Sequence, residues 1–86
     1  MSKTVTVHYL VTSKYYDVTI ETTKRVKDLK KKIENLLSIK LINKLMIKHK
    51  QKRNQTCLSD ENITIEAARV HNGDIITIAK TDVLGG

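Results

Sequence analysis

The chain has 86 residues, which is enough for one small domain with a narrow margin of stability. It contains three glycines, no proline and one cysteine, so a low-complexity chain, an intramolecular disulfide and a cysteine-rich metal site are excluded. The net charge is +7 and no acidic residue occurs from Asn35 to Ser59, which indicates a stretch that attracts phosphate or acidic protein surfaces, or an ordinary solvated lysine-rich face.

Two segments near the start of the chain alternate between apolar and polar residues. In residues 4–10, the alternation places Val5 and Val7 on one side of the segment. In residues 16–21, it places Val18 on the apolar side. Alternation with β-branched residues is typical of half-buried strands. A short polar connection joins the two segments, so we predict an antiparallel hairpin without a glycine turn.

The apolar spacing then changes from two to three and four residues, which predicts an amphipathic helix. The apolar residues with this spacing are Val26, Leu29, Ile33, Leu36 and Leu37. Thr23 is the expected N-cap of this helix. Its apolar stripe must pack against another element, and the face of the hairpin is available.

Alternation returns in residues 44–49, where Leu45 and Ile47 are expected to point inward and Met46 outward. This pattern predicts a third strand. A polar loop over residues 51–56 follows it, and residues 58–63 are expected to form a short turn of helix or strand.

The turn signal Asn72-Gly73 precedes the last predicted strand, in which Ile76 and Ile78 point inward and Ala79 outward. One helix on one face of a sheet makes an α+β domain with two layers, and the other face should meet solvent. We expect this domain to span residues 1–80 and a flexible tail to span residues 81–86.

These residues resemble ubiquitin and its relatives, the β-grasp ubiquitin-like family. The most specific segment is Leu58-Ser59-Asp60-Glu61-Asn62-Ile63, which is similar to the family's leucine-serine-aspartate-x-asparagine-isoleucine segment, and Gly85-Gly86 matches the terminal diglycine. The helix spacing, the third strand and the last turn and strand also agree. The resemblance implies a mixed sheet of four to five strands with one main helix packed on one face.

The resemblance implies that the protein is a modifier whose Gly86 carboxylate forms an isopeptide bond with lysines of target proteins. Partners would be activating and conjugating enzymes and a deconjugating protease; the chain itself would need neither a catalytic residue nor a cofactor. Gly85 and Gly86 suit this role because a tail without side chains can enter a narrow channel. The segment Thr81-Asp82-Val83-Leu84 departs from ubiquitin's basic, leucine-rich tail, which favours a divergent modifier.

Two other functions are compatible with the sequence. The first is a ubiquitin-like protein-interaction domain that is not conjugated, alone or within a larger protein. The second is a sulfur carrier of the same fold, in which the terminal carboxylate becomes a thiocarboxylate. The leucine-serine-aspartate segment resembles the ubiquitin branch more than the sulfur carriers.

The resemblance also implies a recognition patch for ubiquitin-fold-binding modules at Leu10, Met46, His49 and Ala79. Alternation independently turns Met46 and Ala79 outward. Small contiguous apolar patches mark interaction sites, whereas scattered apolar residues are normal on any surface.

Lys50 matches a lysine that ubiquitin uses for chain growth, although it is equally one of many surface lysines. The basic patch of Lys48, Lys50, Lys52 and Arg53 could bind nucleic acid, with RNA as the candidate. The chain has no Phe or Trp to stack on bases, which weakens this hypothesis.

The histidines His8, His49 and His71 lack the spacing of metal ligands, so we expect three surface or edge histidines and no metal site. Cys57 has no evident base partner and is expected to be inert. A single cysteine and the lack of a recognisable signal peptide or membrane span favour a monomer in the cytoplasm or nucleus.

Overall fold

The structure is a computed structural model that describes residues 1–85. It contains five strands, one α-helix and one 3-10 helix among these residues. The elements are β1 (Ser2–Tyr9), β2 (Lys14–Glu21), α1 (Val26–Leu37), β3 (Leu45–Lys48), β4 (Thr56–Leu58), β5 (Ile75–Ile78) and η1 (Lys80–Asp82).

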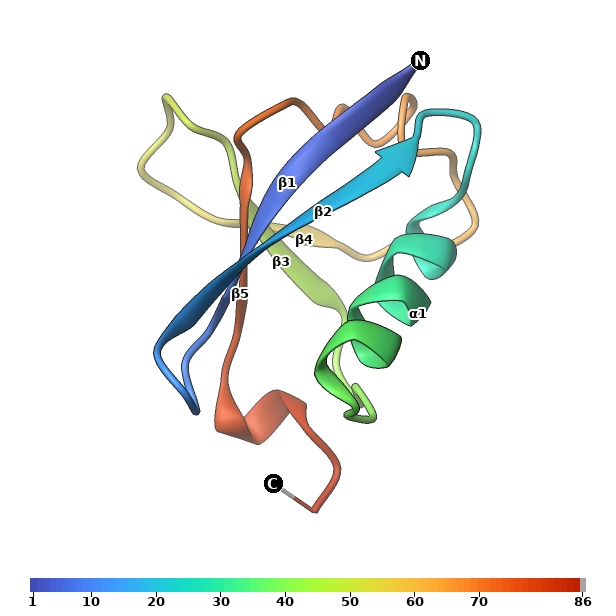
Figure 1. Ribbon diagram of the computed structural model, residues 1–86. Coiled ribbons are helices and arrows are strands. Elements are labelled where there is room, and N and C mark those ends of the chain that lie inside the picture. The colour runs from blue at the N-terminus through green and yellow to red at the C-terminus, as the bar shows by residue number, and fades with distance from the viewer. Residues whose placement is uncertain (86) are drawn as a thin grey trace.

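The strands form one mixed sheet in the order β2-β1-β5-β3-β4. β1 and β5 are parallel and the other neighbours are antiparallel. α1 lies across one face of this sheet, and η1 lies at the end of the molecule away from Met1 (Figure 1). The α+β arrangement with two layers that the sequence predicted is confirmed. No helix in residues 1–85 has the length and apolar character needed to cross a membrane.

The first hairpin follows the alternation of its residues. Val5 pairs with Val18, and both side chains are buried. The connection at residues 10–13 closes without glycine because Ser13 itself adopts a left-handed φ of 58°. This conformation costs a residue with a Cβ about 1 kcal/mol or more, so the pairing along β1 and β2 must hold it in place.

The core lies between α1 and the sheet. Val26, Leu29 and Ile33 of α1 are fully buried, as the spacing of three and four predicted, whereas Leu36 of the same predicted stripe is 47% exposed. Complete burial stabilises each such side chain by about 1.5–3 kcal/mol. The buried residues of the core are Val5, Val7, Val18, Ile20, Val26, Leu29, Ile33, Leu41, Leu45, Ile47, Leu58, Ile65, Val70, Ile76, Ile78 and Val83.

The N-terminus of α1 differs from the prediction, because Arg25 is the N-cap and Thr23 is not. The carboxylate of Asp28 accepts a hydrogen bond from the Arg25 N–H at 2.9 Å. The first N–H groups of the helix donate to distant carbonyls, Val26 to Ile63 and Lys27 to Glu61, both at 3.0 Å. Because residues 61–63 satisfy these donors, no capping hydroxyl is needed.

Glu61 links α1 to the start of β3. Its carboxylate forms ion pairs with Lys30 at 3.0 Å and with Lys44 at 3.2 Å. Partial burial raises the pKa of Glu61, but the hydrogen bonds and charges of Lys30 and Lys44 outweigh this effect and hold the pKa below its ordinary value. Residues 58–63, which carry the resemblance to the ubiquitin-like family, therefore connect the helix to the sheet through ion pairs.

Replacing Glu61 with glutamine is expected to lower the free energy of unfolding by about 1 kcal/mol near neutral pH. A lowered pKa means that the stabilisation is present above the pKa of the unfolded glutamate and is lost as pH falls through the folded pKa. The difference between wild type and variant should therefore shrink between about pH 5 and pH 3 in urea unfolding. Glu66→Gln, at an exposed position, is the control. An unchanged difference across this range would contradict the role of the pair.

The chain remains packed against the domain beyond β5. Val83 is buried and forms an isolated antiparallel bridge with Leu41, and the Leu84 N–H donates to the Lys40 carbonyl at 2.9 Å. Asp82 accepts hydrogen bonds from the side chain of Asn43 and from the Ala79 N–H, both at 2.8 Å. Residues 81–84, which we predicted to belong to a flexible tail, therefore contact the domain, because apolar Val83 completes the core beside the α1–β3 connection.

Candidate binding surfaces

The sheet face opposite α1, here called the outer face, carries one row of residues across all five strands. His8 pairs with Tyr15 of β2 and with Thr77 of β5, and Met46 pairs with Cys57 of β4. Met46 precedes Ile47, which pairs with Ile76, so Met46 lies beside Thr77. Strict alternation with buried neighbours places the row on the solvent side.

Two rings form the aromatic part of this row. The imidazole of His8 stacks on the ring of Tyr15 with centroids 4.1 Å apart and an angle of 10° between planes. Tyr15 is 64% exposed. A flat aromatic surface that is already ordered can contact a partner with little loss of side-chain entropy. Sequence reasoning missed this pair because it depends on the register between β1 and β2.

The predicted patch residues do not all lie together on the outer face. Leu10 is exposed and its N–H donates to Ile78 at 2.9 Å, which places it next to Ala79 at one end of β5. Met46 is half-buried and lies on β3 beside Thr77, which is two residues before Ala79. His49 lies beyond the opposite end of β5, because its neighbour Lys48 pairs with Ile75. The structure therefore brings Leu10, Met46 and Ala79 toward one end and places His49 elsewhere.

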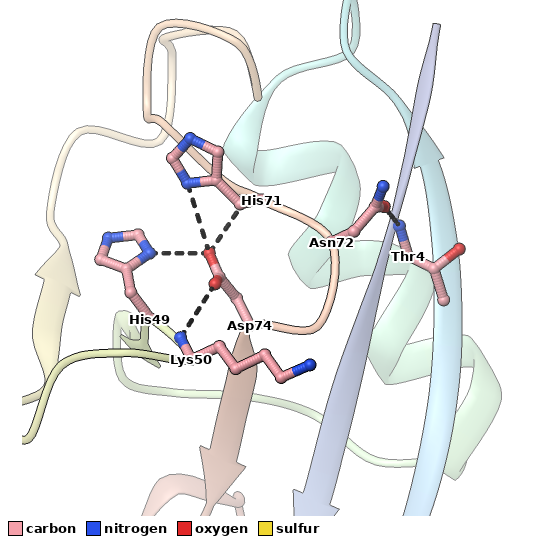
Figure 2. A network of polar contacts seen from close by, with 6 residues as sticks. All are labelled: Thr4, His49, Lys50, His71, Asn72 and Asp74. Atoms are coloured by element: carbon pink, nitrogen blue, oxygen red, sulfur yellow. Dashed lines mark hydrogen bonds and ion pairs between the residues drawn. The ribbon is translucent and has the colours of Figure 1, made fainter.

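His49 belongs instead to a second site, the histidine cluster of His49, His71 and Asp74. Nδ1 of His49 is 2.7 Å from Oδ2 of Asp74, and Nδ1 of His71 is 4.0 Å from the same oxygen. Both imidazoles point toward this carboxylate (Figure 2). His49 and His71 lie at the surface, as the sequence predicted, but the spacing of the histidines gave no sign that these two share a carboxylate. Their sequence separation hid the cluster, which the pairing of β3 with β5 creates.

The carboxylate of Asp74 is almost completely buried and accepts further hydrogen bonds from the backbone. The His71 N–H donates to Oδ2 at 2.8 Å and the Lys50 N–H lies 3.4 Å from Oδ1. Gly73, with a φ of 85°, makes the turn that brings His71 back to Asp74. The predicted Asn72-Gly73 turn is confirmed, and Asn72 fixes it to β1 by accepting the Thr4 N–H at 2.8 Å (Figure 2).

An open pocket of about 400 Å³ lies beside the histidine cluster, and only part of the predicted basic patch lines it. Lys50, Lys52 and Arg69 line this pocket together with the two histidines. Lys48 lies on β3, on the outer face, and Arg53 is exposed in the β3–β4 loop. Arg69 was missed by the sequence reasoning because it is distant in the chain and lies outside the basic run.

Of the two predicted conjugation residues, the structure describes Gly85. Gly85 is exposed, has a φ of 68°, and would meet nothing within 4 Å if it carried a Cβ. Gly86 lies outside the residues that the structure describes. Conjugation through Gly86 and chain growth through Lys50 remain predictions.

Comparison with solved structures identifies the fold. The ubiquitin-like domain of tubulin-binding cofactor B matches with a TM-score of 0.81 at 19% identity, over 99% of this chain and 93% of that one. The C-terminal ubiquitin-like domain of mouse tubulin-specific chaperone e matches with a TM-score of 0.74 at 14% identity, over 92% and 86%. The chain has the ubiquitin-like fold. A ubiquitin-like domain of an Arabidopsis thaliana protein also matches, with a TM-score of 0.63 at 21% identity, over 88% of this chain and 73% of that one.

The predicted β-grasp architecture is thereby confirmed for this ubiquitin-like domain. At these identities the likeness concerns the fold alone. No protein-family model matches the sequence, and no curated protein matches it. The function must therefore be argued from the surfaces of the domain itself.

Proposed function

We propose that this chain is a non-conjugated ubiquitin-like interaction domain that binds an acidic protein surface through its outer face. The observation that carries the proposal is the ordered, solvent-facing row that joins the His8–Tyr15 stack to Met46 across the sheet. The domain has no catalytic role on this proposal.

Charge on and beside the outer face determines the kind of partner. Lys48 extends from β3 on this face, Lys14 begins β2, and Lys80 directly follows Ala79. Asp17 and Glu21 are the acidic residues of β2 on the same face. Asp17 accepts a hydrogen bond from Thr6 at 3.3 Å, and Glu21 forms an ion pair with the N-terminal amine at 3.6 Å. With a net charge of +7, the domain favours encounter with an acidic partner, and Met46 in the same row can adapt to an apolar side chain of that partner.

The packing of the C-terminal segment supports an interaction domain over a modifier. A modifier tail must leave its domain to reach an enzyme active site. Here buried Val83 and the hydrogen bond from Leu84 to Lys40 hold the chain to within one residue of Gly85. Release of this segment would expose Val83 and break the Leu41 bridge, at a cost of about 1–2 kcal/mol. The solved domains named for tubulin-binding cofactor B and tubulin-specific chaperone e are parts of other named proteins, which also fits an interaction domain.

Met46→Asp is expected to weaken binding to the acidic partner at least 10-fold, because it places a negative charge within the outer-face row. The matched control is Leu36→Asp, which introduces the same charge at a residue of α1 that is 47% exposed. Partners captured from source cells are to be purified and their affinities for wild type and both variants measured by calorimetry at low and physiological salt. Equal affinities of the two variants, or an exclusively nucleic-acid partner, would contradict the proposal.

A second arm of this experiment separates the domain from a modifier. Tagged chains with and without Gly86 are expressed in the source cell and examined on denaturing gels and by peptide mass spectrometry. On our proposal, deletion of Gly86 leaves both partner binding and the band pattern unchanged. A ladder that depends on Gly86, with isopeptide remnants on lysines, would establish conjugation, and a terminal thiocarboxylate would establish a sulfur carrier.

A further inference from the structure

We propose that the histidine cluster is a binding site for a divalent transition metal ion, with Zn²⁺ as the preferred ion. One ligand atom each from His49, His71 and Asp74 lies within 4.8 Å of the other two. Two imidazoles and a carboxylate form a donor set that suits zinc and related ions. This site is separate from the outer-face row and does not depend on the proposed function.

The distances in the cluster require only small adjustments to hold an ion. Ligand atoms around tetrahedral zinc, with bonds of about 2.0–2.2 Å, lie about 3.3–3.6 Å apart. The His49–Asp74 distance of 2.7 Å is shorter than this value and the His71–Asp74 distance of 4.0 Å is longer. Rotation of the two imidazoles about their side-chain bonds can correct both distances, since neither ring lies in the core. The same rotation can shorten the distance between the ligand atoms of His49 and His71, which is at most 4.8 Å. The side chain of His49 is 22% exposed and that of His71 is 65% exposed.

Asp74 provides the fixed part of the site. Its side chain is 2% exposed, and two backbone N–H groups, from His71 and Lys50, orient the carboxylate. No lysine or arginine within residues 1–85 forms an ion pair with it, so its charge faces the two imidazoles. A buried carboxylate without a permanent positive partner is costly, and a bound divalent cation would offset that cost.

Metal binding to His49 through Nδ1 requires the tautomer that carries its proton on Nε2. The Nδ1 atom shares a hydrogen bond with Asp74, and coordination through Nδ1 requires that this proton leave. Water accepts this proton and returns one to Nε2, so the neutral imidazole changes tautomer with no net release of a proton. The ion then replaces the hydrogen bond between His49 and Asp74.

The neighbouring pocket defines the remaining coordination position. Three protein ligands leave tetrahedral zinc open to water or an anion, which is the arrangement of an accessible site. The pocket of about 400 Å³ opens at the cluster and is lined by Lys50, Lys52 and Arg69. These cations oppose a further positive charge, so the site binds zinc less tightly than a closed four-ligand site, and they favour an anion at the open position.

The test is a Zn²⁺ titration of the full chain without a histidine tag, measured by calorimetry and repeated with Co²⁺, whose visible absorption reports coordination geometry. One ion per chain is expected. His71→Gln and His49→Gln should each weaken binding at least 10-fold, while His8→Gln and Cys57→Ser leave the affinity of this site unchanged. Lack of binding by the wild type, or wild-type affinity in His71→Gln, would overturn the proposal.

A second measurement distinguishes loss of the site from loss of the fold. The His71 side chain is largely exposed, so His71→Gln should retain the wild-type circular dichroism spectrum and melting temperature without metal. Saturating Zn²⁺ should raise the melting temperature of wild type but not of His71→Gln, because an ion that binds only the folded chain stabilises it. An equal increase in both proteins would place the ion elsewhere.

Discussion

Asp74→Asn is expected to destabilise the metal-free domain by about 2–3 kcal/mol, and to lower its melting temperature by roughly 10–20 °C. The buried carboxylate accepts hydrogen bonds from His49 at 2.7 Å and from the His71 N–H at 2.8 Å, with the Lys50 N–H nearby. Asparagine has nearly the same shape but loses the charge. Its NH₂ group would also face one of these donors, which leaves hydrogen-bonding groups unmatched in a buried position.

The measurement is urea unfolding in the presence of a chelator, so that a bound metal does not contribute. Asp17→Asn is the matched control, because Asp17 is exposed on β2 and accepts a single long hydrogen bond at 3.3 Å from Thr6. It should change the free energy of unfolding by less than about 0.5 kcal/mol. If Asp74→Asn were equally mild, water would be able to replace the carboxylate, and the turn at Gly73 would be held by its backbone alone.

The fold could be predicted from sequence because the spacing of apolar residues within each strand and the helix indicates which side chains are buried. Alternation identified the inward side chains of β1 and β3, and the spacing of Val26, Leu29 and Ile33 identified the buried stripe of α1. These patterns are local and depend only on the geometry of each element. Thr23 was chosen wrongly as the N-cap because the true partners of the first helical N–H groups are carbonyls of residues 61–63. No local pattern reports such a tertiary contact.

The candidate sites depend on register, which the sequence reasoning did not determine. His49 and Asp74 meet because Lys48 pairs with Ile75, and His8 meets Tyr15 through the first hairpin. A shift of one residue would turn these side chains to the other face. The Asn72-Gly73 turn followed directly by an aspartate was the one signal of a fixed carboxylate, and pairing of the third and last predicted strands would have pointed to His49.

Ile76→Ala is expected to have the largest effect on stability, about 3–4 kcal/mol. Ile76 lies in the central strand β5, is fully buried, and pairs with Val7 on one side and Ile47 on the other, both also fully buried. Removal of its three outer carbon atoms leaves a cavity that these neighbours cannot fill without distorting two strand pairings at once. A domain of this size has only about 5–10 kcal/mol of stability, so the variant should be partly unfolded at physiological temperature.

Ile75→Ala tests whether the effect comes from position rather than from residue type. Ile75 is the preceding residue of β5 and pairs with Thr6 and Lys48, with its side chain half-buried on the outer face. It should cost less than about 1.5 kcal/mol in urea unfolding, with the same dependence on urea concentration as wild type. Equal losses in the two variants would mean that both faces of β5 are covered, and an outer face that is covered within the domain could not receive the partner proposed for Met46.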